Sequence, residues 1–260
     1  MTIRQGKPLS QITEAAIDEY MLDRLDEGAS PATCNRELST LSIAFTQAAK
    51  KWKWVKGNPC LLVSKLPENN IQDIWLSGEQ EKQLLKTAKA YLHGDLPDII
   101  LFAIHTGARR KEILFTDIGQ VDFKRRTVTL LRTKNKEPRT VPMNNTLYNM
   151  LSRRLATDKR EQGWLFVTST GQQIGARNLD RSFRLALKKA KIEKFWFHGL
   201  RHTFGTRLAQ AGKSSHEIGA LMGIKTEKVL KRYMHHNVES LRNAVHSLDQ
   251  RHLRVVEGKR

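Results

Sequence analysis

The chain has 260 residues, and its 45 Lys and Arg against 26 Asp and Glu give a formal net charge of +19 at pH 7. With 39% hydrophobic and 27% charged residues, its composition is typical of a globular protein and excludes a disordered basic tail. The longest aliphatic or aromatic run, Ile99 to Ile104, is far shorter than the roughly 20 residues of a membrane-spanning helix. The N-terminus lacks the apolar core of a secretory signal, and Cys34 and Cys60 form no metal-binding pattern. We therefore expect an intracellular protein without structural zinc.

The positive charge is unevenly distributed along the chain. Residues 1–75 contain 9 basic and 9 acidic side chains, whereas residues 76–260 contain 36 basic and 17 acidic ones. A polyanion is the natural partner for such a segment, because lysines and arginines that neutralise phosphates release condensed counterions. This distribution favours a nucleic acid, although charge alone leaves a membrane surface open.

Helical patterns dominate the first 60 residues. Thr13 is a candidate cap for a helix that ends near Glu27, before Gly28. Ser30 and Pro31 fit the cap and first position of a second helix, which we expect to end near 57–59. Its apolar residues recur at steps of three and four, as on a buried face: Leu38, Leu41, Phe45, Ala48 and Trp52. The pattern predicts a small all-α domain over residues 1–66, followed by a linker over 67–75 that lacks periodicity.

A second domain is predicted over residues 76–260. Ser77 and Gln80 form a capping-box pattern that opens a helix, and Pro97 begins another that reaches Gly107. Between 120 and 143, three β-branched segments separated by basic turns predict a three-stranded antiparallel sheet. Helical patterns then continue from about 144 to 250, interrupted by a short apolar run over 164–167. The expected fold class is mainly α with a small antiparallel β-sheet.

Four patches of this second domain contain residue types that act on phosphates. They are HTGARRKE (105–112) with Arg109, TKNKEPR (133–139) with Lys134, FHGLRHTFGTRLAQAG (197–212) with His198 and Arg201, and LMGIKTEKVLKRYMH (221–235) with Tyr233. Arginine can bind a phosphate through two hydrogen bonds, and histidine and arginine three residues apart share a helix face. Each patch alone is more often a surface helix, a solvated turn or a core tyrosine.

The order and spacing of the four patches strongly resemble the tyrosine recombinase, or phage integrase, family. Arg109 and Lys134 are 25 residues apart, and Arg201 and Tyr233 are 32 apart. The segment SPATCNRELSTLSIAFTQAAKKWKWVKGNP is also similar to the family's helical core-binding domain, so the resemblance covers nearly the whole chain. It implies an all-α N-terminal domain and an α+β catalytic domain.

The resemblance also implies an activity and its residues. Tyr233 is expected to attack duplex DNA and form a 3′-phosphotyrosine, with Arg109 and Arg201 on the phosphate, Lys134 protonating the leaving 5′ oxygen and His198 exchanging a proton with the tyrosine or hydrogen-bonding the phosphate. No cofactor is expected. The implied protein is a site-specific recombinase or integrase of a mobile element. It would assemble as a tetramer on paired DNA sites, in the cytoplasm of a prokaryotic or phage-infected host, with possible accessory DNA-bending or directionality proteins.

Further basic residues are candidates for DNA contact. Lysines at the end of the second helix could contact phosphates, and solvated lysines at a helix terminus are the alternative. The full set of predicted DNA-binding residues is Arg36, Lys50, Lys51, Lys53, Lys136, Arg139 and Arg207. In related enzymes a C-terminal tail, here 237–260, packs on a neighbouring protomer, and packing on its own chain is the alternative. No extra arm-binding domain is expected before the helical one.

One position departs from the family pattern. The family usually has His or Trp nine residues before the tyrosine, where this chain has Ile224. Three interpretations follow: an active enzyme that tolerates the change, a slower enzyme, or a site in which His202, His235 or His236 substitutes. The alternatives to a recombinase are a type IB topoisomerase-like enzyme that relaxes DNA, and a DNA-binding regulator with weakened catalysis.

Overall fold

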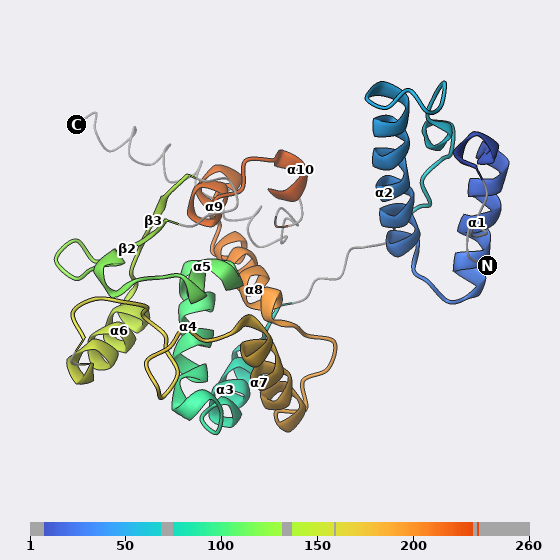
Figure 1. The fold of residues 1–260 in the computed structure, drawn as a ribbon. Coiled ribbons are helices and arrows are strands. Elements are labelled where there is room, and N and C mark those ends of the chain that lie inside the picture. The colour runs from blue at the N-terminus through green and yellow to red at the C-terminus, as the bar shows by residue number, and fades with distance from the viewer. Residues whose placement is uncertain (1–7, 69–74, 132–136, 159, 231–232, 234–260) are drawn as a thin grey trace, which may run out of the picture. The chain divides into compact units, whose positions relative to one another are not determined.

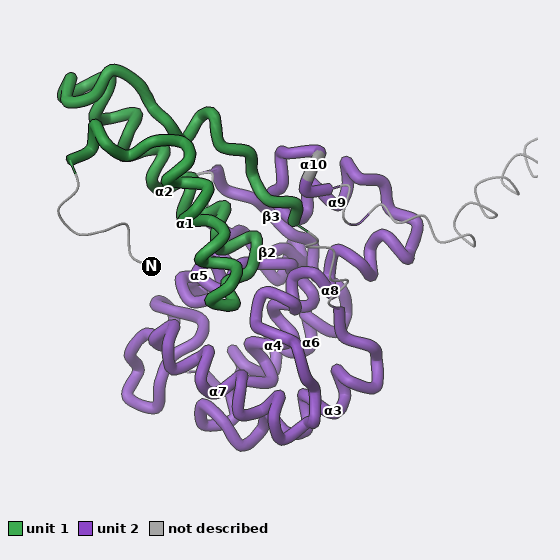
Figure 2. The backbone as a smooth tube through the Cα atoms, turned by 90° about the vertical axis from the view of Figure 1, so that its right-hand side faces the viewer, with its two compact units in different colours: residues 1–71 green, residues 72–260 purple. Residues whose placement is uncertain are grey.

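The structure, a computed structural model, describes residues 8–68, 75–131, 137–158, 160–230 and 233. The chain divides into two compact units, Met1–Ile71 and Gln72–Arg260, coloured separately in Figure 2. The division falls within the predicted linker 67–75, and the domain assignment itself stays a prediction. No helix in the described segments is both long and apolar enough to cross a membrane.

The N-terminal unit is helical. A 3-10 turn η1 (Leu9–Gln11) precedes α1 (Glu14–Asp26) and α2 (Pro31–Lys50), and a second 3-10 turn η2 (Pro59–Leu61) packs on α2 (Figure 1). Thr13 and Ser30 cap the two helices through their side-chain oxygens, as the sequence predicts. The buried side chains that join these elements are Ile17, Met21, Cys34, Leu38, Phe45, Cys60 and Val63.

The second helix ends earlier than its pattern indicates. It stops at Lys50 rather than near 57–59, so Trp52 no longer lies on its apolar face. Trp52 is 46% exposed and stacks on Trp54, with ring centroids 4.6 Å apart. The prediction that Trp52 belongs to the buried stripe is therefore wrong, because that stripe requires two more residues of helix.

The second unit is a helical domain with a small sheet at one side (Figure 1). The antiparallel sheet has the order β1-β2-β3, and Val128 pairs with Val141. This architecture confirms the predicted fold class of a mainly α protein with a small antiparallel β-sheet. In chain order the elements are α3 (Gly78–Ala88), η3 (Leu92–Gly94), α4 (Leu96–Thr106), α5 (Arg110–Leu114), η4 (Ile118–Gln120), β1 (Val121–Asp122), β2 (Thr127–Leu130), β3 (Arg139–Pro142), α6 (Asn145–Thr157), α7 (Ala176–Lys189), α8 (Phe197–Gln210), α9 (Ser215–Met222) and α10 (Glu227–Leu230).

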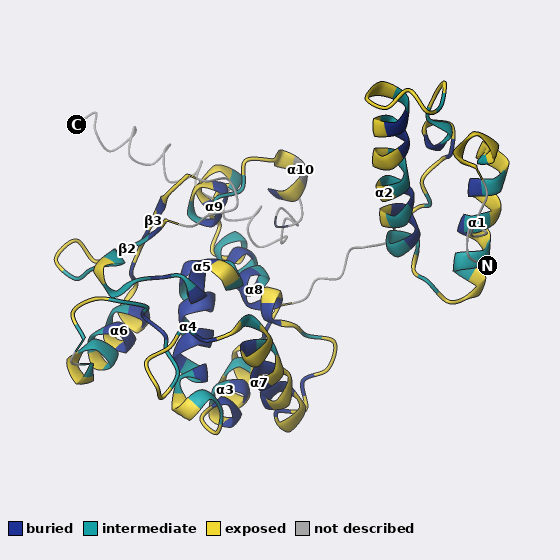
Figure 3. Ribbon diagram, in the orientation of Figure 1, coloured by how far each residue is buried: buried dark blue, intermediate teal, exposed yellow. Residues whose placement is uncertain are grey.

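Helix α4 is the centre of this unit. It is buried along most of its length (Figure 3), and it packs against α3, α6 and α8. It ends at Thr106 and is followed by Gly107, whose φ of +61° is a left-handed conformation that glycine adopts without strain. A Cβ at Gly107 would lie 2.4 Å from the Phe204 ring on α8. This close approach brings the segment after α4 next to α8, and therefore brings two of the four patches together.

Candidate active site

Arg109 lies immediately before α5, in an extended conformation, and Glu112 fixes it there. The Glu112 carboxylate accepts hydrogen bonds from the Arg109 backbone N–H, at 2.8 Å, and from Arg109 Nη1, also at 2.8 Å. The side chain of Glu112, the third residue of this short helix, thus accepts a hydrogen bond from a backbone N–H that has no partner within the helix. The guanidinium is oriented by the same carboxylate.

Arg139 of β3 supports the same carboxylate from the sheet. Its Nη2 lies 2.8 Å from Glu112 Oε2, and its Nε donates to the Leu221 carbonyl of α9 at 3.0 Å. The Arg139 side chain is 8% exposed and that of Glu112 is 1% exposed. Burial by itself would raise the pKa of Glu112, but the hydrogen bonds and charges of Arg139 and Arg109 outweigh it and lower that pKa. Arg139, predicted to contact DNA, instead lies in the interior as a link between α5, α9 and the sheet.

Arg201 of α8 is the most enclosed cation of the group. It is 3% exposed, and it donates from Nη1 to the Gly107 carbonyl and from Nη2 to the Met222 carbonyl, each at 2.6 Å. Burial, followed by the nearby charges of Arg109 and Arg139, lowers its pKa to about 9. Arg109 Nη2 lies 3.4 Å from the next carbonyl, that of Gly223. The two guanidinium groups therefore converge on consecutive carbonyls at the C-terminal end of α9, where a helix favours cations.

The tyrosine of the fourth patch reaches the same helix as Arg201. Its hydroxyl lies 2.9 Å from Nδ1 of His202, and the His202 ring makes an edge contact with the His198 ring, with centroids 5.0 Å apart. Because His198 and His202 are four residues apart on α8, they share one face of the helix. His198, His202 and Tyr233 thus form a row of rings next to Arg201.

The phenol ring itself is packed inside the unit. Tyr233 is 5% exposed and belongs to a small apolar cluster with Phe204, Ile218, Met222 and Leu230, which Ile224 also touches. A Cβ on Gly205 would lie 2.6 Å from Tyr233 Cε1, so the absence of a side chain at Gly205 admits the ring. The ring is buried, and of the cationic groups expected around it the described ones, Arg109 and Arg201, lie close to each other.

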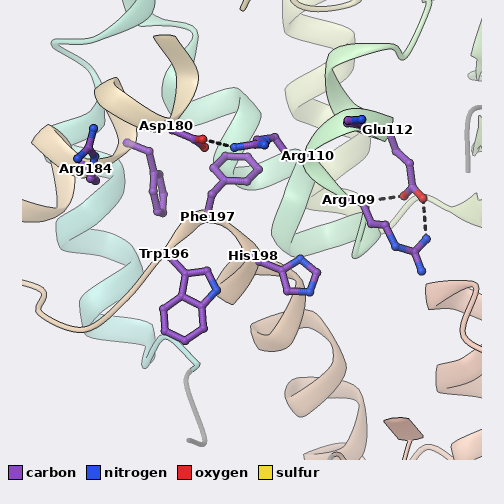
Figure 4. A pocket seen from close by; sticks show the side chains of 10 residues that line it. Arg109, Arg110, Glu112, Asp180, Arg184, Trp196, Phe197 and His198 are labelled. Carbon is purple, nitrogen blue, oxygen red and sulfur yellow. Dashed lines mark hydrogen bonds and ion pairs between the residues drawn. The ribbon is translucent and has the colours of Figure 1, made fainter. Parts of the chain in front are cut away.

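A pocket of about 1000 Å³ opens beside these residues (Figure 4). Arg109 and His198 line it together with Arg110, which pairs with Asp180 of α7. Trp196, 46% exposed, lies next to His198 in the same pocket. Trp196 belongs to none of the four sequence patches, although it lies only two residues before His198.

The other predicted site residues fall into three groups. Lys134, Lys136 and the tail 237–260 lie outside the described residues. Arg207 is engaged within the unit, with Nη1 2.5 Å from Glu81 and Nη2 donating to the Leu76 carbonyl at 3.2 Å. On the N-terminal unit the remaining predicted DNA-binding residues are exposed: Arg36, Lys50, Lys51 and Lys53. Within the described part of the chain, no three His, Cys, Asp or Glu side chains form a candidate metal site.

Comparison with known proteins identifies relatives over most of the chain. Residues 74–240 match the phage integrase family. The chain is 26% identical over 220 residues to the integrase of Salmonella phage P22, covering 80% of this chain and 54% of that protein. It is 30% identical over 214 residues to a putative integrase/recombinase of Haemophilus influenzae, covering 78% of this chain and 66% of that protein. The chain thus spans about half to two thirds of the length of these relatives.

Solved structures show the same fold. The Tn1549 transposon integrase in complex with circular intermediate DNA superposes with a TM-score of 0.75 at 23% identity, covering 92% of this chain and 86% of that one. A lambda integrase tetramer bound to a Holliday junction gives a TM-score of 0.70 at 18% identity, covering 84% and 66%. On the family match over residues 74–240, the chain belongs to the phage integrase family, the tyrosine recombinases.

Proposed function

We propose that this chain is a site-specific DNA recombinase that cleaves and rejoins duplex DNA through a 3′-phosphotyrosine. The observation that supports this function most directly is the meeting of Arg109 and Arg201 beside the row His198, His202 and Tyr233. Both guanidinium groups reach carbonyls at the end of α9, and the tyrosine hydroxyl bonds to the same helix that carries Arg201. Two fixed cations next to a nucleophilic hydroxyl are what attack on a phosphodiester requires.

The two arginines would neutralise charge on the phosphate. Attack by an oxygen nucleophile adds negative charge to the nonbridging oxygens of a pentacoordinate transition state. Arg109 and Arg201 can each offer planar N–H donors to those oxygens, and Glu112 fixes the orientation of Arg109. Burial of Arg201 costs free energy in the unbound protein, which an incoming phosphate anion offsets. The site is therefore arranged to favour an anion.

The remaining groups would move protons and form the covalent bond. Tyr233 Oη bonds to phosphorus while the 5′ oxygen leaves and takes a proton from Lys134. His198 lines the pocket beside Arg109 and would hydrogen-bond the phosphate. The phosphotyrosine conserves the energy of the broken ester, so rejoining needs neither ATP nor a cofactor. Phenolate is the better leaving group when the 5′ hydroxyl returns, because tyrosine has a pKa near 10.

The proposed partners are duplex DNA and further copies of this chain. The positive charge of residues 76–260 supports DNA binding. Lambda integrase, which has the same fold, has been solved as a tetramer bound to a Holliday junction. We extend this to a tetramer of this chain on paired sites, acting in the cytoplasm of a bacterial host with accessory DNA-bending or directionality proteins. The similar proteins carry names of integrases and recombinases, which favours recombination over topoisomerase-like relaxation or regulation.

A suicide substrate tests the activity. The attachment sequence would be found by sequencing the junctions of the element that carries this gene, and a nick would be placed next to the scissile phosphate so that rejoining is prevented. We expect a covalent protein–DNA adduct with the wild-type chain and none with Tyr233→Phe, which keeps the ring but lacks the nucleophilic oxygen. Absence of an adduct with the wild-type chain on its own attachment DNA would contradict the proposed function and favour a DNA-binding regulator.

A further inference from the structure

The Tyr233 hydroxyl needs a group that takes its proton during attack. A phenol is a weak nucleophile while protonated, so an adjacent base activates it. The position at which the family usually has His or Trp is occupied by Ile224, whose side chain has neither a donor nor an acceptor. Ile224 packs instead in the apolar cluster that holds the tyrosine ring. Ile224 therefore cannot be the polar partner of the hydroxyl.

The structure places His202 at this hydroxyl. The distance from Tyr233 Oη to His202 Nδ1 is 2.9 Å, within the range of a hydrogen bond. In the tautomer with the proton on Nε2, Nδ1 is unprotonated and the phenol donates to it. His202 thus contacts the oxygen that is to form the new bond to phosphorus.

The packing on α8 orients this contact. The His198 ring meets the His202 ring edge to face, with an interplanar angle of 89°, and the Gly205 position leaves room for the phenol ring one turn further along. The His202 and Tyr233 rings have centroids 5.8 Å apart and planes 34° from each other. The His202 imidazole therefore lies between the His198 ring and the Tyr233 ring.

We propose that His202 accepts the proton of the Tyr233 hydroxyl during DNA cleavage, a role that rests on the recombinase function proposed above. The O–H proton passes to His202 Nδ1 as Tyr233 Oη bonds to phosphorus and the bond from phosphorus to the 5′ oxygen breaks. The 5′ oxygen takes its proton from Lys134. In rejoining, the imidazolium returns the proton to the departing phenolate. His198 is then left to act on the phosphate, and His202 supplies the proton acceptor that Ile224 cannot.

Two substitutions separate proton acceptance from hydrogen bonding. His202→Asn keeps an oxygen or nitrogen near the position of Nδ1 and can accept the phenol's hydrogen bond, but an amide takes up no proton at neutral pH. His202→Ala removes both capacities. The matched control is His93→Asn, an exposed histidine of η3 whose φ of 53° asparagine tolerates. Thermal melting and DNA affinity are measured for each variant to verify that it folds and binds.

The assay is covalent adduct formation on the nicked attachment duplex, in two forms. One form has an ordinary 5′ bridging oxygen at the scissile phosphate and the other has sulfur, whose thiolate leaves without a proton. We expect both His202 variants to cleave about 100-fold more slowly than wild type on both substrates, the scale of general base catalysis. A Lys134→Ala variant, which lacks the proposed acid, should recover on the sulfur substrate only.

Three results would overturn the assignment while leaving the recombinase function intact. The first is cleavage by His202→Asn at the same rate as wild type and the His93→Asn control. The second is cleavage by His202→Ala that is faster than wild type. The third is a return of either His202 variant to the wild-type cleavage rate on the sulfur substrate. The third result would indicate that His202 donates a proton to the leaving 5′ oxygen. A wild-type chain that forms no adduct on either substrate would instead contradict the proposed function itself.

Discussion

Gly205 determines where the nucleophile lies. A Cβ at this position would be 2.6 Å from Tyr233 Cε1 and 2.9 Å from Met222 Sδ, so Gly205→Ala must displace the ring. Because a displacement of about 1 Å can slow a positioned reaction about 100-fold, we expect cleavage to fall by one to two orders of magnitude. DNA affinity should be retained. The measurement is the rate of adduct formation on the nicked duplex beside a filter-binding or fluorescence titration.

The change from glycine to alanine should stabilise helix α8, so a loss of helix stability would not explain slower cleavage by Gly205→Ala. Alanine stabilises a helix interior by up to about 1 kcal/mol relative to glycine, so lower activity cannot be attributed to a weaker α8. Gly78→Ala in α3, where an added Cβ meets nothing within 4 Å, is the matched variant and should cleave normally. Normal cleavage by Gly205→Ala would show that the ring leaves α8 before it attacks.

At the scale of elements, Glu112 joins α5, β3 and α9 through Arg109 and Arg139. Glu112→Gln removes the negative charge and leaves Arg139 buried without a counterion. Breaking one side of a buried ion pair costs about 3 to 5 kcal/mol, so we expect a loss of about 3 kcal/mol in the free energy of unfolding at pH 7, measured by urea denaturation. Glu79→Gln, an exposed glutamate of α3, should change the midpoint little.

The same carboxylate makes stability depend on pH. Its pKa is lower in the folded chain than the ordinary value of 4.5, so the folded state binds fewer protons than the unfolded state near that pH. The stabilisation is complete above pH 4.5 and is lost as the pH falls below it. Wild type should therefore lose more stability between pH 6 and pH 3.5 than Glu112→Gln. Parallel losses in the two proteins would assign the acid sensitivity to other carboxylates.

The features of helices and strands that the sequence predicted correctly depend on residues that are close together in the chain. The caps at Thr13, Ser30 and Ser77 depend on side chains that reach backbone groups within three residues, and the strands depend on alternation over a few positions. Trp52 was misplaced because periodicity does not reveal where a helix stops.

Contacts between distant residues were beyond the sequence patterns. The engagement of Arg139 with Glu112 and of Arg207 with Glu81 depends on packing between distant elements, and an arginine in a basic segment has the same appearance whether it is paired or free. The hydrogen bond from Tyr233 to His202 spans 31 residues, and the sequence left three histidines as candidates. Of these candidates the structure describes His202, which bonds to Tyr233 from α8, whereas His235 and His236 lie outside the described residues.

At the scale of the whole molecule, the two parts of the chain differ in net charge and in where exposed basic residues are grouped. The excess positive charge lies in residues 76–260, whereas residues 1–75 have no net charge but contain a group of exposed lysines at the end of α2. Trp52 and Trp54 are exposed beside them. The lysine ammonium groups can contact phosphates, and the exposed rings can pack on the neighbouring sugars. We therefore expect this end of α2 to contact DNA, although residues 1–75 have no net charge.

The salt dependence of DNA binding tests this expectation on the full chain. Each lysine that neutralises a phosphate contributes about 0.9 to the slope of log K against log salt concentration. The triple variant Lys50→Ala, Lys51→Ala and Lys53→Ala should lower the magnitude of that slope by about 2 to 3 and weaken binding at low salt. The charge-matched variant Lys82→Ala, Lys86→Ala and Lys89→Ala changes three exposed positions of α3 and the segment after it. If the lysines at the end of α2 contact phosphates, only the first variant should change the slope by this amount. Equal changes in both variants would show that the effect reflects net charge alone.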